Sequence, residues 1–175
     1  MDVLKAISKR RSIRSYFPKP IETDKLQRIL ESARIAPSAK SKYEWRMIVV
    51  RDKETKEKLV SACKGQKFVA QADTVIVSVG TNPDYIMSCG QSGNTVDITI
   101  ALQNLVTQAT EEGLGSCWIC AFYPDKVKKI LDIPKEYSIP AIILLGYSGE
   151  EPKPASRKEF SELFYGEKWE QEIKL

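Results

Sequence analysis

Residues 139–147 read IPAIILLGY, and this stretch decides how the chain folds because nearly every residue in it is apolar. A strand with one face in water alternates apolar and polar side chains. A strand that is covered on both faces is apolar throughout. We therefore expect residues 139–147 to form a buried strand with helices packed on both sides of it.

The segments before this strand alternate between the two types of secondary structure. Further strands are predicted at residues 45–50, at 73–81 (DTVIVSVGT) and at 116–119. Helices are predicted at residues 2–11, from Thr23 or Asp24 through Ala33, and at 53–63, 95–112 and 124–131. This order predicts an α+β fold of mixed α/β layers, with a central mixed sheet of four to five strands flanked by helices. Residues 1–175 are expected to form a single domain.

Two features of the sequence favour a homodimer. In the helix at 95–112, Val96 and Ile100 widen an apolar face that is already complete without them. Such a helix is either enclosed by its own domain or lies at a subunit interface. The second interpretation is favoured by residues 150–175, an extension that needs a surface to pack on and contains Phe160, Leu163, Phe164 and Trp169. We expect this extension to pack on the partner subunit.

The overall composition is that of a globular protein, with 42% hydrophobic and 29% charged residues. No apolar run approaches the roughly 20 residues that cross a bilayer, and no signal-peptide core follows the basic start. We therefore expect a cytoplasmic protein without a membrane partner.

Histidine is absent, and the four cysteines are Cys63, Cys89, Cys117 and Cys120. Without histidine, Ser-His and Cys-His catalysis are excluded, so an enzyme of this sequence needs another proton carrier or a cofactor. Cys117 and Cys120 form a C-x-x-C, which leaves open a redox dithiol or half of a zinc site. Because there is no second C-x-x-C, we predict no metal and favour reduced, structural cysteines.

Positive charge is concentrated at the start of the chain. The first twenty residues carry a formal charge of +5, whereas the whole chain carries +4. Arg10 and Arg14 would share one face of a helix, and in an extended chain Arg10, Ser12 and Arg14 would share one side. Either geometry presents two guanidiniums and a hydroxyl to one phosphate. The alternative is a solvated helix end whose cations favour the negative pole of the helix dipole.

Two other kinds of phosphate ligand are disfavoured. Nucleic acid is not expected, because stacking aromatic residues and a second basic stripe are missing. Residues 113–116 read GLGS, but they follow a helix and precede a strand, the reverse of a dinucleotide-binding loop. We expect them to form a helix C-cap and a turn.

Several motifs in order along the chain resemble those of the FMN-dependent nitroreductase superfamily. They are RRSIR at residues 10–14, APSA at 36–39 ahead of Trp45, GQKF at 65–68, GLGSCWI at 113–119 followed by Ala121-Phe122, LGY at 145–147, and Arg157-Lys158. The resemblance covers most of the chain. It implies a nitroreductase-like fold in an intertwined homodimer, with FMN bound at the subunit interface and NAD(P)H as co-substrate.

The resemblance also implies a role for particular residues. The FMN phosphate would be held by Arg10, Ser12 and Arg14, joined by Arg157 and Lys158, with Arg11 facing away or contacting the ribityl chain. The flavin ring would be lined by Pro37, Ser38, Ala39 and Ser41 of the partner subunit, with Gln66 at its polar edge. Backbone amides of Cys120 and Ala121 would approach flavin N5, which carries the hydride, so no catalytic side chain is predicted.

Three residues depart from the family pattern. Ser41 stands where many relatives have an asparagine, Glu44 replaces a proline, and Cys120 replaces glycine or glutamate. A shorter Ser41 reaches less far, and Glu44 brings a negative charge toward the mouth of the pocket.

The activity implied is hydride transfer from NAD(P)H through the flavin to a small electron acceptor such as a nitroaromatic or a quinone, in a ping-pong cycle. Alternatives are a flavin-binding protein with little turnover, a reductive dehalogenase-like or flavin-modifying relative with a lid at residues 82–94, and a basic binding module without a cofactor.

Overall fold

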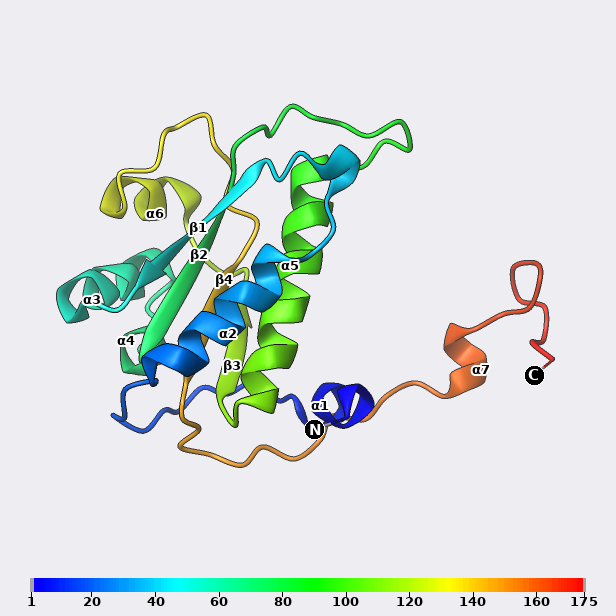
Figure 1. The fold of residues 1–175 in the computed structure, drawn as a ribbon, viewed down its shortest axis with the longest axis horizontal. Coiled ribbons are helices and arrows are strands. Elements are labelled where there is room, and N and C mark those ends of the chain that lie inside the picture. Colours follow the sequence, from blue (N-terminus) through cyan, green and yellow to red (C-terminus); the bar gives the residue numbers. More distant parts are fainter. Residues whose placement is uncertain (1, 175) are drawn as a thin grey trace.

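A computed structural model describes residues 2–174 and shows a four-stranded sheet between two layers of helices (Figure 1). The strands are β1 (Trp45–Val50), β2 (Thr74–Gly80), β3 (Gly115–Ile119) and β4 (Ile142–Gly146), in the order β1-β2-β4-β3. Every neighbouring pair of these strands is antiparallel. The α+β class is confirmed.

The expectation of a mixed sheet is wrong for these strands. Between β1 and β2, two helices in succession, α3 (Lys53–Ala62) and α4 (Phe68–Gln71), return the chain to the end of the sheet that it left. Helix α5 (Gly93–Glu111) does connect two strands of the same direction, β2 and β3, but β4 lies between them and runs opposite to both. Parallel neighbours therefore do not arise.

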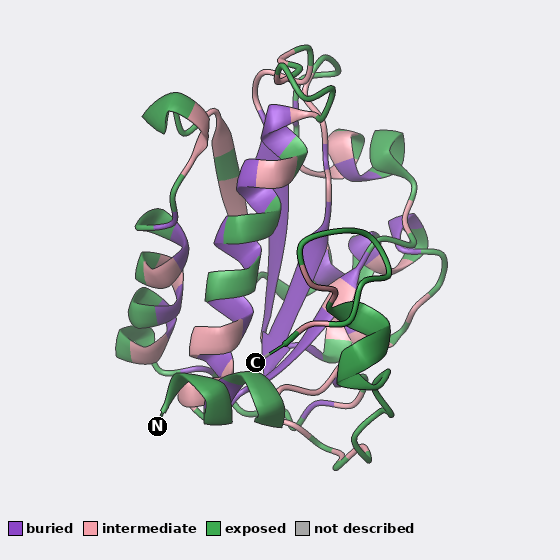
Figure 2. Ribbon diagram, turned by 90° about the vertical axis from the view of Figure 1, so that its right-hand side faces the viewer, coloured by how far each residue is buried: buried purple, intermediate pink, exposed green. Residues whose placement is uncertain are grey.

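The helical layers bury opposite faces of the sheet. Helices α3, α4 and α6 (Pro124–Ile130) cover one face, and α2 (Thr23–Arg34) and α5 cover the other. In β4, Ile142 and Leu144 belong to the first core, and Ile143 and Leu145 to the second. All four are fully buried, which confirms the strand predicted from IPAIILLGY (Figure 2).

Local signals explain where most helices begin and end. The Asp52 carboxylate accepts the Thr55 N–H (2.8 Å) at the start of α3, and Pro124 occupies the first turn of α6. After α5, Gly113 has a φ of +77°, which is costly for residues with a side chain. Residues 113–116 thus end the helix and begin β3, as predicted. Helix α4 was not among the helices predicted from the sequence.

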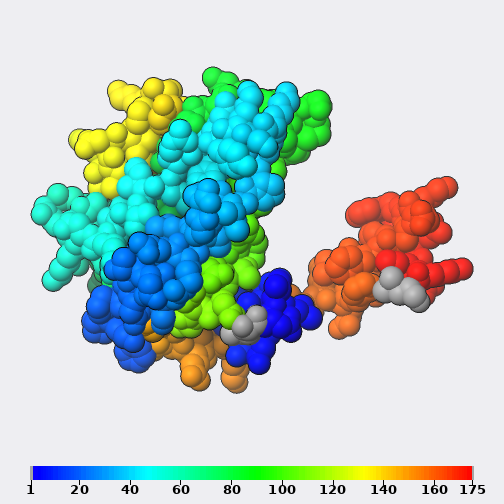
Figure 3. Space-filling view, in the orientation of Figure 1, coloured from blue at the N-terminus to red at the C-terminus, as the bar shows by residue number. Residues whose placement is uncertain are grey.

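The chain ends in an extension that leaves the compact body. After β4, the backbone runs away from the sheet to the short helix α7 (Phe160–Leu163) (Figures 1 and 3). Its apolar side chains are exposed, with 80% of Trp169 and 52% of Phe160 accessible. Packing of this extension on a partner subunit stays a prediction. Within residues 2–174, no helix combines the length and apolarity needed to cross a membrane.

Candidate functional site

The basic segment of residues 10–14 is extended and lies along the outer edge of β3. Helix α1 (Val3–Lys9) is shorter than predicted, so Arg10 follows it as the C-cap. The Ile13 N–H donates to the Ser116 carbonyl (2.9 Å), and Ser12 and Ser116 form a parallel bridge. The segment is also held by Tyr16, whose hydroxyl donates to the Ile13 carbonyl (2.8 Å). Of the two predicted arrangements, the extended one is adopted.

A cavity of about 280 Å³ opens beside this segment. Its lining includes Lys9, Arg10 and Arg11, and also Glu150 and Glu151. The Arg11 guanidinium donates to the carbonyls of Ser8 (2.7 Å) and Arg10 (2.9 Å). The cavity therefore brings cationic side chains together with two carboxylates.

Ser12 and Arg14 lie outside the lining of this cavity. Ser12 is half-buried and Arg14 is exposed. The backbone N–H of Arg14 donates to the Glu150 carboxylate. The structure thus brings Arg10 and Arg11 together in one cavity and keeps Ser12 and Arg14 next to it in the chain.

The charges of this region act on the buried thiol of Cys117. Burial raises the pKa of Cys117, and the negative charge of Glu150 raises it further, whereas Arg14 and Arg10 lower it. Burial likewise raises the pKa of the Tyr16 hydroxyl. Cys117 is therefore a neutral core residue beneath the basic segment, while Cys120, at the other end of the C-x-x-C, is exposed.

A second group of predicted residues meets at the far end of β3. The Gln66 side-chain amide donates to the carbonyls of Ala121 (3.0 Å) and Cys63 (2.8 Å). Cys120 and Ala121 follow β3 directly and are both exposed. At about 3.3 Å per residue, the strand separates Ser116 from Cys120 by ~13 Å. A ligand with an anionic group at one end and a ring system at the other can therefore lie along β3.

The loop that contains Pro37, Ser38, Ala39 and Ser41 precedes β1, on the opposite edge of the sheet. The strand pairing puts the start of β1 and the end of β3 at the same end of the sheet. The Ser38 hydroxyl accepts the Tyr43 N–H (3.0 Å). Lys40, Ser41 and Tyr43 have positive φ angles of 54°, 52° and 51°. This left-handed backbone conformation costs free energy in residues other than glycine.

Asp97 of α5 stabilises this loop and was missed in the sequence. Its carboxylate oxygens accept the Ala39 N–H at 3.0 and 3.1 Å, and the residue is only 6% exposed. A carboxylate is expensive to bury without hydrogen bonds. The signal in the sequence was an aspartate within the buried face of the predicted helix at 95–112.

Glu44 does not present a free negative charge. Its carboxylate accepts a hydrogen bond from the Asn82 side-chain amide (3.1 Å) and lies 4.0 Å from the Lys42 ammonium. Lys40 and Lys42 in turn lie over the ring of Tyr85, at 5.8 and 5.6 Å from its centroid. These contacts join the loop to residues 82–92, the irregular segment before α5.

Arg157 and Lys158 belong to the extension and do not line the cavity beside residues 10–14. Arg157 donates to the carbonyls of Ala155 and Ser156 (3.3 Å each), and Lys158 lies 3.8 Å from Glu162. Within residues 2–174, no three Cys, Asp or Glu side chains are grouped so that they could hold a metal ion.

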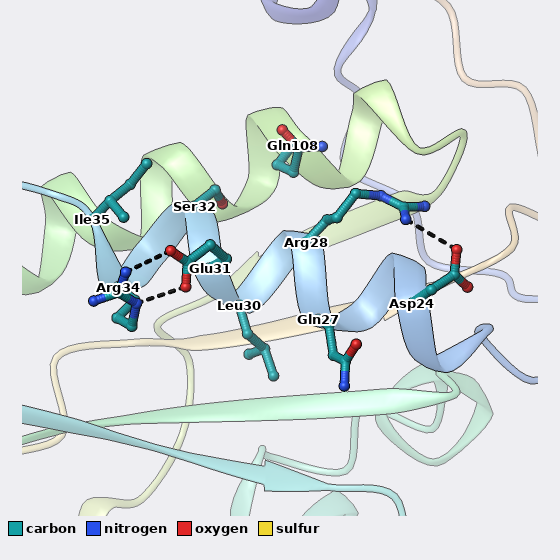
Figure 4. A pocket seen from close by; sticks show the side chains of 9 residues that line it. All are labelled: Asp24, Gln27, Arg28, Leu30, Glu31, Ser32, Arg34, Ile35 and Gln108. Carbon is teal, nitrogen blue, oxygen red and sulfur yellow. Dashed lines mark hydrogen bonds and ion pairs between the residues drawn. The ribbon is translucent and has the colours of Figure 1, made fainter.

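A shallow groove of about 850 Å³ lies on the outer face of α2 and α5 (Figure 4). Ion pairs join Arg28 to Asp24 (3.0 Å) and Arg34 to Glu31 (2.6 Å) along it. Ile35, which is 65% exposed, also lines the groove. Gln108 is the α5 residue in this groove, and Val96 and Ile100, on which the predicted subunit interface rests, do not line it.

Solved structures with the same fold define the class of protein. A nitroreductase family protein from Clostridium novyi NT is 33% identical, with a TM-score of 0.80 and coverage of 99% of this chain and 97% of that one. An FMN-dependent nitroreductase from Clostridium difficile R20291 is 32% identical, with a TM-score of 0.82 and coverage of 95% and 99%. The three-layer α+β fold is therefore that of nitroreductases.

Sequence comparison leads to the same family. The family model described as "Putative TM nitroreductase" matches residues 2–174. A protein named NADH dehydrogenase from Thermus thermophilus is 32% identical over 188 aligned positions, which cover 90% of this chain and 92% of that protein. The chain belongs to the nitroreductase family and is an oxidoreductase.

Proposed function

We propose that the protein is an FMN-dependent oxidoreductase that takes hydride from NAD(P)H and passes it to a small electron acceptor such as a nitroaromatic or a quinone. When bound, FMN supplies the hydride-accepting and hydride-donating centre, which side chains do not provide. The observation that carries the proposal is the alignment along β3 of a cationic cavity at one end with Gln66, Cys120 and Ala121 at the other. The names of relatives, among them the FMN-dependent nitroreductase from Clostridium difficile, support it.

The residues at the start of β3 fit a phosphate monoester. Arg10 and Arg11 offer guanidinium donors in a cavity of about 280 Å³, and the half-buried Ser12 offers a hydroxyl beside them. Guanidinium groups form strong, charge-assisted hydrogen bonds with phosphate oxygens. In this proposal Arg10, Ser12 and Arg14 bind the phosphate, and Arg11 orients the Arg10 backbone through its hydrogen bond to that carbonyl.

The residues at the end of β3 fit the polar edge of a ring system. Gln66 ties the chain after β3 to α3 through its two hydrogen bonds, so the backbone of Cys120 and Ala121 is held in place. Both residues are accessible to a ligand. Their role in this proposal is to position the reacting ring atom and to leave room for one small substrate at a time.

We also propose that the complete site needs two copies of the chain. The loop with Pro37, Ser38, Ala39 and Ser41 lies at the edge of the sheet farthest from the basic segment, so within one copy the two cannot enclose one ring. The extension provides a means of association, because its apolar side chains are exposed. In the dimer, Arg157 and Lys158 of this extension would add positive charge to the phosphate end.

The experiment that tests this function is the visible spectrum of the purified protein before and after anaerobic addition of NADH or NADPH. A yellow protein that bleaches with nicotinamide and recovers its colour with a quinone supports the proposal. A colourless protein that does not bind added FMN contradicts it. A yellow protein that does not bleach indicates flavin binding without turnover.

A double variant tests the phosphate assignment. Arg10→Ala with Arg14→Ala removes two charge-assisted contacts of about 1.5–3 kcal/mol each, so the Kd for FMN is expected to rise by at least ~100-fold. Lys5→Ala with Lys53→Ala removes the same charge from two exposed positions and serves as the control. Equal FMN affinity of the two double variants would contradict the assignment.

A further inference from the structure

We propose that Glu150 competes with the cofactor phosphate for the basic segment, so that this carboxylate sets how tightly FMN is held. The inference rests on the proposed function and adds a residue that neither the family motifs nor the sequence pattern indicated. It starts from one contact, the hydrogen bond that the Arg14 backbone N–H donates to the Glu150 carboxylate.

The backbone around Glu150 is fixed against the basic segment. Tyr16 and Ser148 form an antiparallel bridge, and the Gly149 N–H donates to the Ser15 carbonyl (2.8 Å). The Ser148 hydroxyl accepts the Glu150 N–H (3.3 Å) and donates to the Glu150 carbonyl (2.5 Å). Glu150 is therefore held beside the segment and is not a surface residue that meets it by chance.

The Glu150 carboxylate and the FMN phosphate would occupy the same cationic cavity. Glu150 lines the cavity together with Arg10 and Arg11. A carboxylate and a phosphate both accept hydrogen bonds from N–H donors and are both stabilised by guanidinium groups. In a cavity of about 280 Å³, a dianion and a carboxylate repel each other, so binding of one weakens binding of the other.

The electrostatic effect of Glu150 opposes that of the arginines. Arg14 and Arg10 lower the pKa of Cys117, whereas Glu150 raises it. The carboxylate thus offsets part of the positive field that would attract a phosphate. When no phosphate is present, the same carboxylate relieves repulsion among the neighbouring cations and keeps residues 10–14 extended.

Glu150→Gln tests the inference, because glutamine keeps an oxygen acceptor for the Arg14 N–H and removes the charge. The Kd for FMN, measured by quenching of flavin fluorescence, is expected to fall about tenfold, since one repulsive charge pair is lost. Riboflavin, which lacks the phosphate, is expected to bind both forms within about twofold, because the ring end is unchanged. Glu57→Gln, an equal charge change at an exposed residue of α3 that does not line this cavity, is the matched control with a change below about threefold.

The outcomes separate this inference from the proposed function. Unchanged or weaker FMN binding by Glu150→Gln, with normal binding by the unmodified protein, overturns the competition and leaves the function standing. An equal gain for riboflavin also overturns it, because the effect would not involve the phosphate. If the unmodified protein does not bind FMN, the proposed function itself fails. Glu150→Ser, which also removes the charge, provides a second test if the glutamine variant does not fold.

Discussion

Replacement of Asp97 by alanine tests whether a single buried carboxylate maintains the loop between α2 and β1. Its two oxygens accept the Ala39 N–H at 3.0 and 3.1 Å, and Asp97 is 6% exposed. Hydrogen bonds to charged groups contribute about 1.5–3 kcal/mol, and loss of the acceptor leaves a partly buried N–H without a partner. We therefore expect Asp97→Ala to lower the free energy of unfolding by ~2 kcal/mol.

Two measurements check this expectation. Urea denaturation reports the free energy of unfolding, and amide hydrogen exchange at Ala39 reports whether the loop opens locally. Asp97→Asn keeps one acceptor oxygen and should lose less than about 1 kcal/mol, and Asp84→Asn, in an exposed position, serves as the control. A free energy of unfolding of Asp97→Ala within about 0.5 kcal/mol of the unmodified protein, with unchanged exchange at Ala39, would refute the reasoning.

Three further predictions follow from packing and titration. Leu145→Ala removes a fully buried side chain of β4 and should lower the free energy of unfolding, measured by urea denaturation, by about 2–5 kcal/mol. A decrease of less than about 1 kcal/mol would contradict the assigned core. Burial raises the pKa of Cys63 to about 11, so iodoacetamide at pH 8 should label the exposed Cys120 and spare Cys63. Mass spectrometry can measure the labelling of each cysteine, and equal labelling would argue against the burial of Cys63. The hydrogen bond from the Tyr147 hydroxyl (2.5 Å) is the largest of several contacts that together lower the pKa of Glu22 to about 2, with Lys25 and Lys19 also contributing. The stabilisation that Tyr147→Phe removes should therefore be present above pH 4.5 and disappear as the pH falls toward 2, and a Tm difference that is constant over that range would exclude this linkage.

The elements that the sequence predicted well are those with a strong hydrophobic pattern. The all-apolar strand at residues 139–147 became β4, and the long helix predicted at 95–112 became α5 (Gly93–Glu111). In both cases the period of the apolar residues reflects a neighbouring layer that covers them. Strand direction carries no such signal, because helices between strands are compatible with parallel and antiparallel neighbours.

The candidate site also has a part that the sequence predicts and a part that it does not. The residues that follow one another in a motif, such as Arg10 and Arg11, are predictable because their charge density is a local property of the sequence. The contacts of Asp97 with Ala39 and of Glu150 with Arg14 join residues that are distant in sequence, 58 and 136 positions apart. Such pairs depend on how the layers pack, and no local pattern indicates them.

The central claim is that the basic segment near the amino terminus binds the phosphate of FMN at a site shared by two copies of the chain. Sedimentation velocity with detection at the flavin absorbance band measures cofactor binding and subunit assembly in one experiment. The account predicts that the flavin sediments with a species of twice the 19.8 kDa mass of the chain, and that Arg10→Ala with Arg14→Ala releases it. Flavin that sediments with a monomer, or that stays bound to the double variant, would contradict the account.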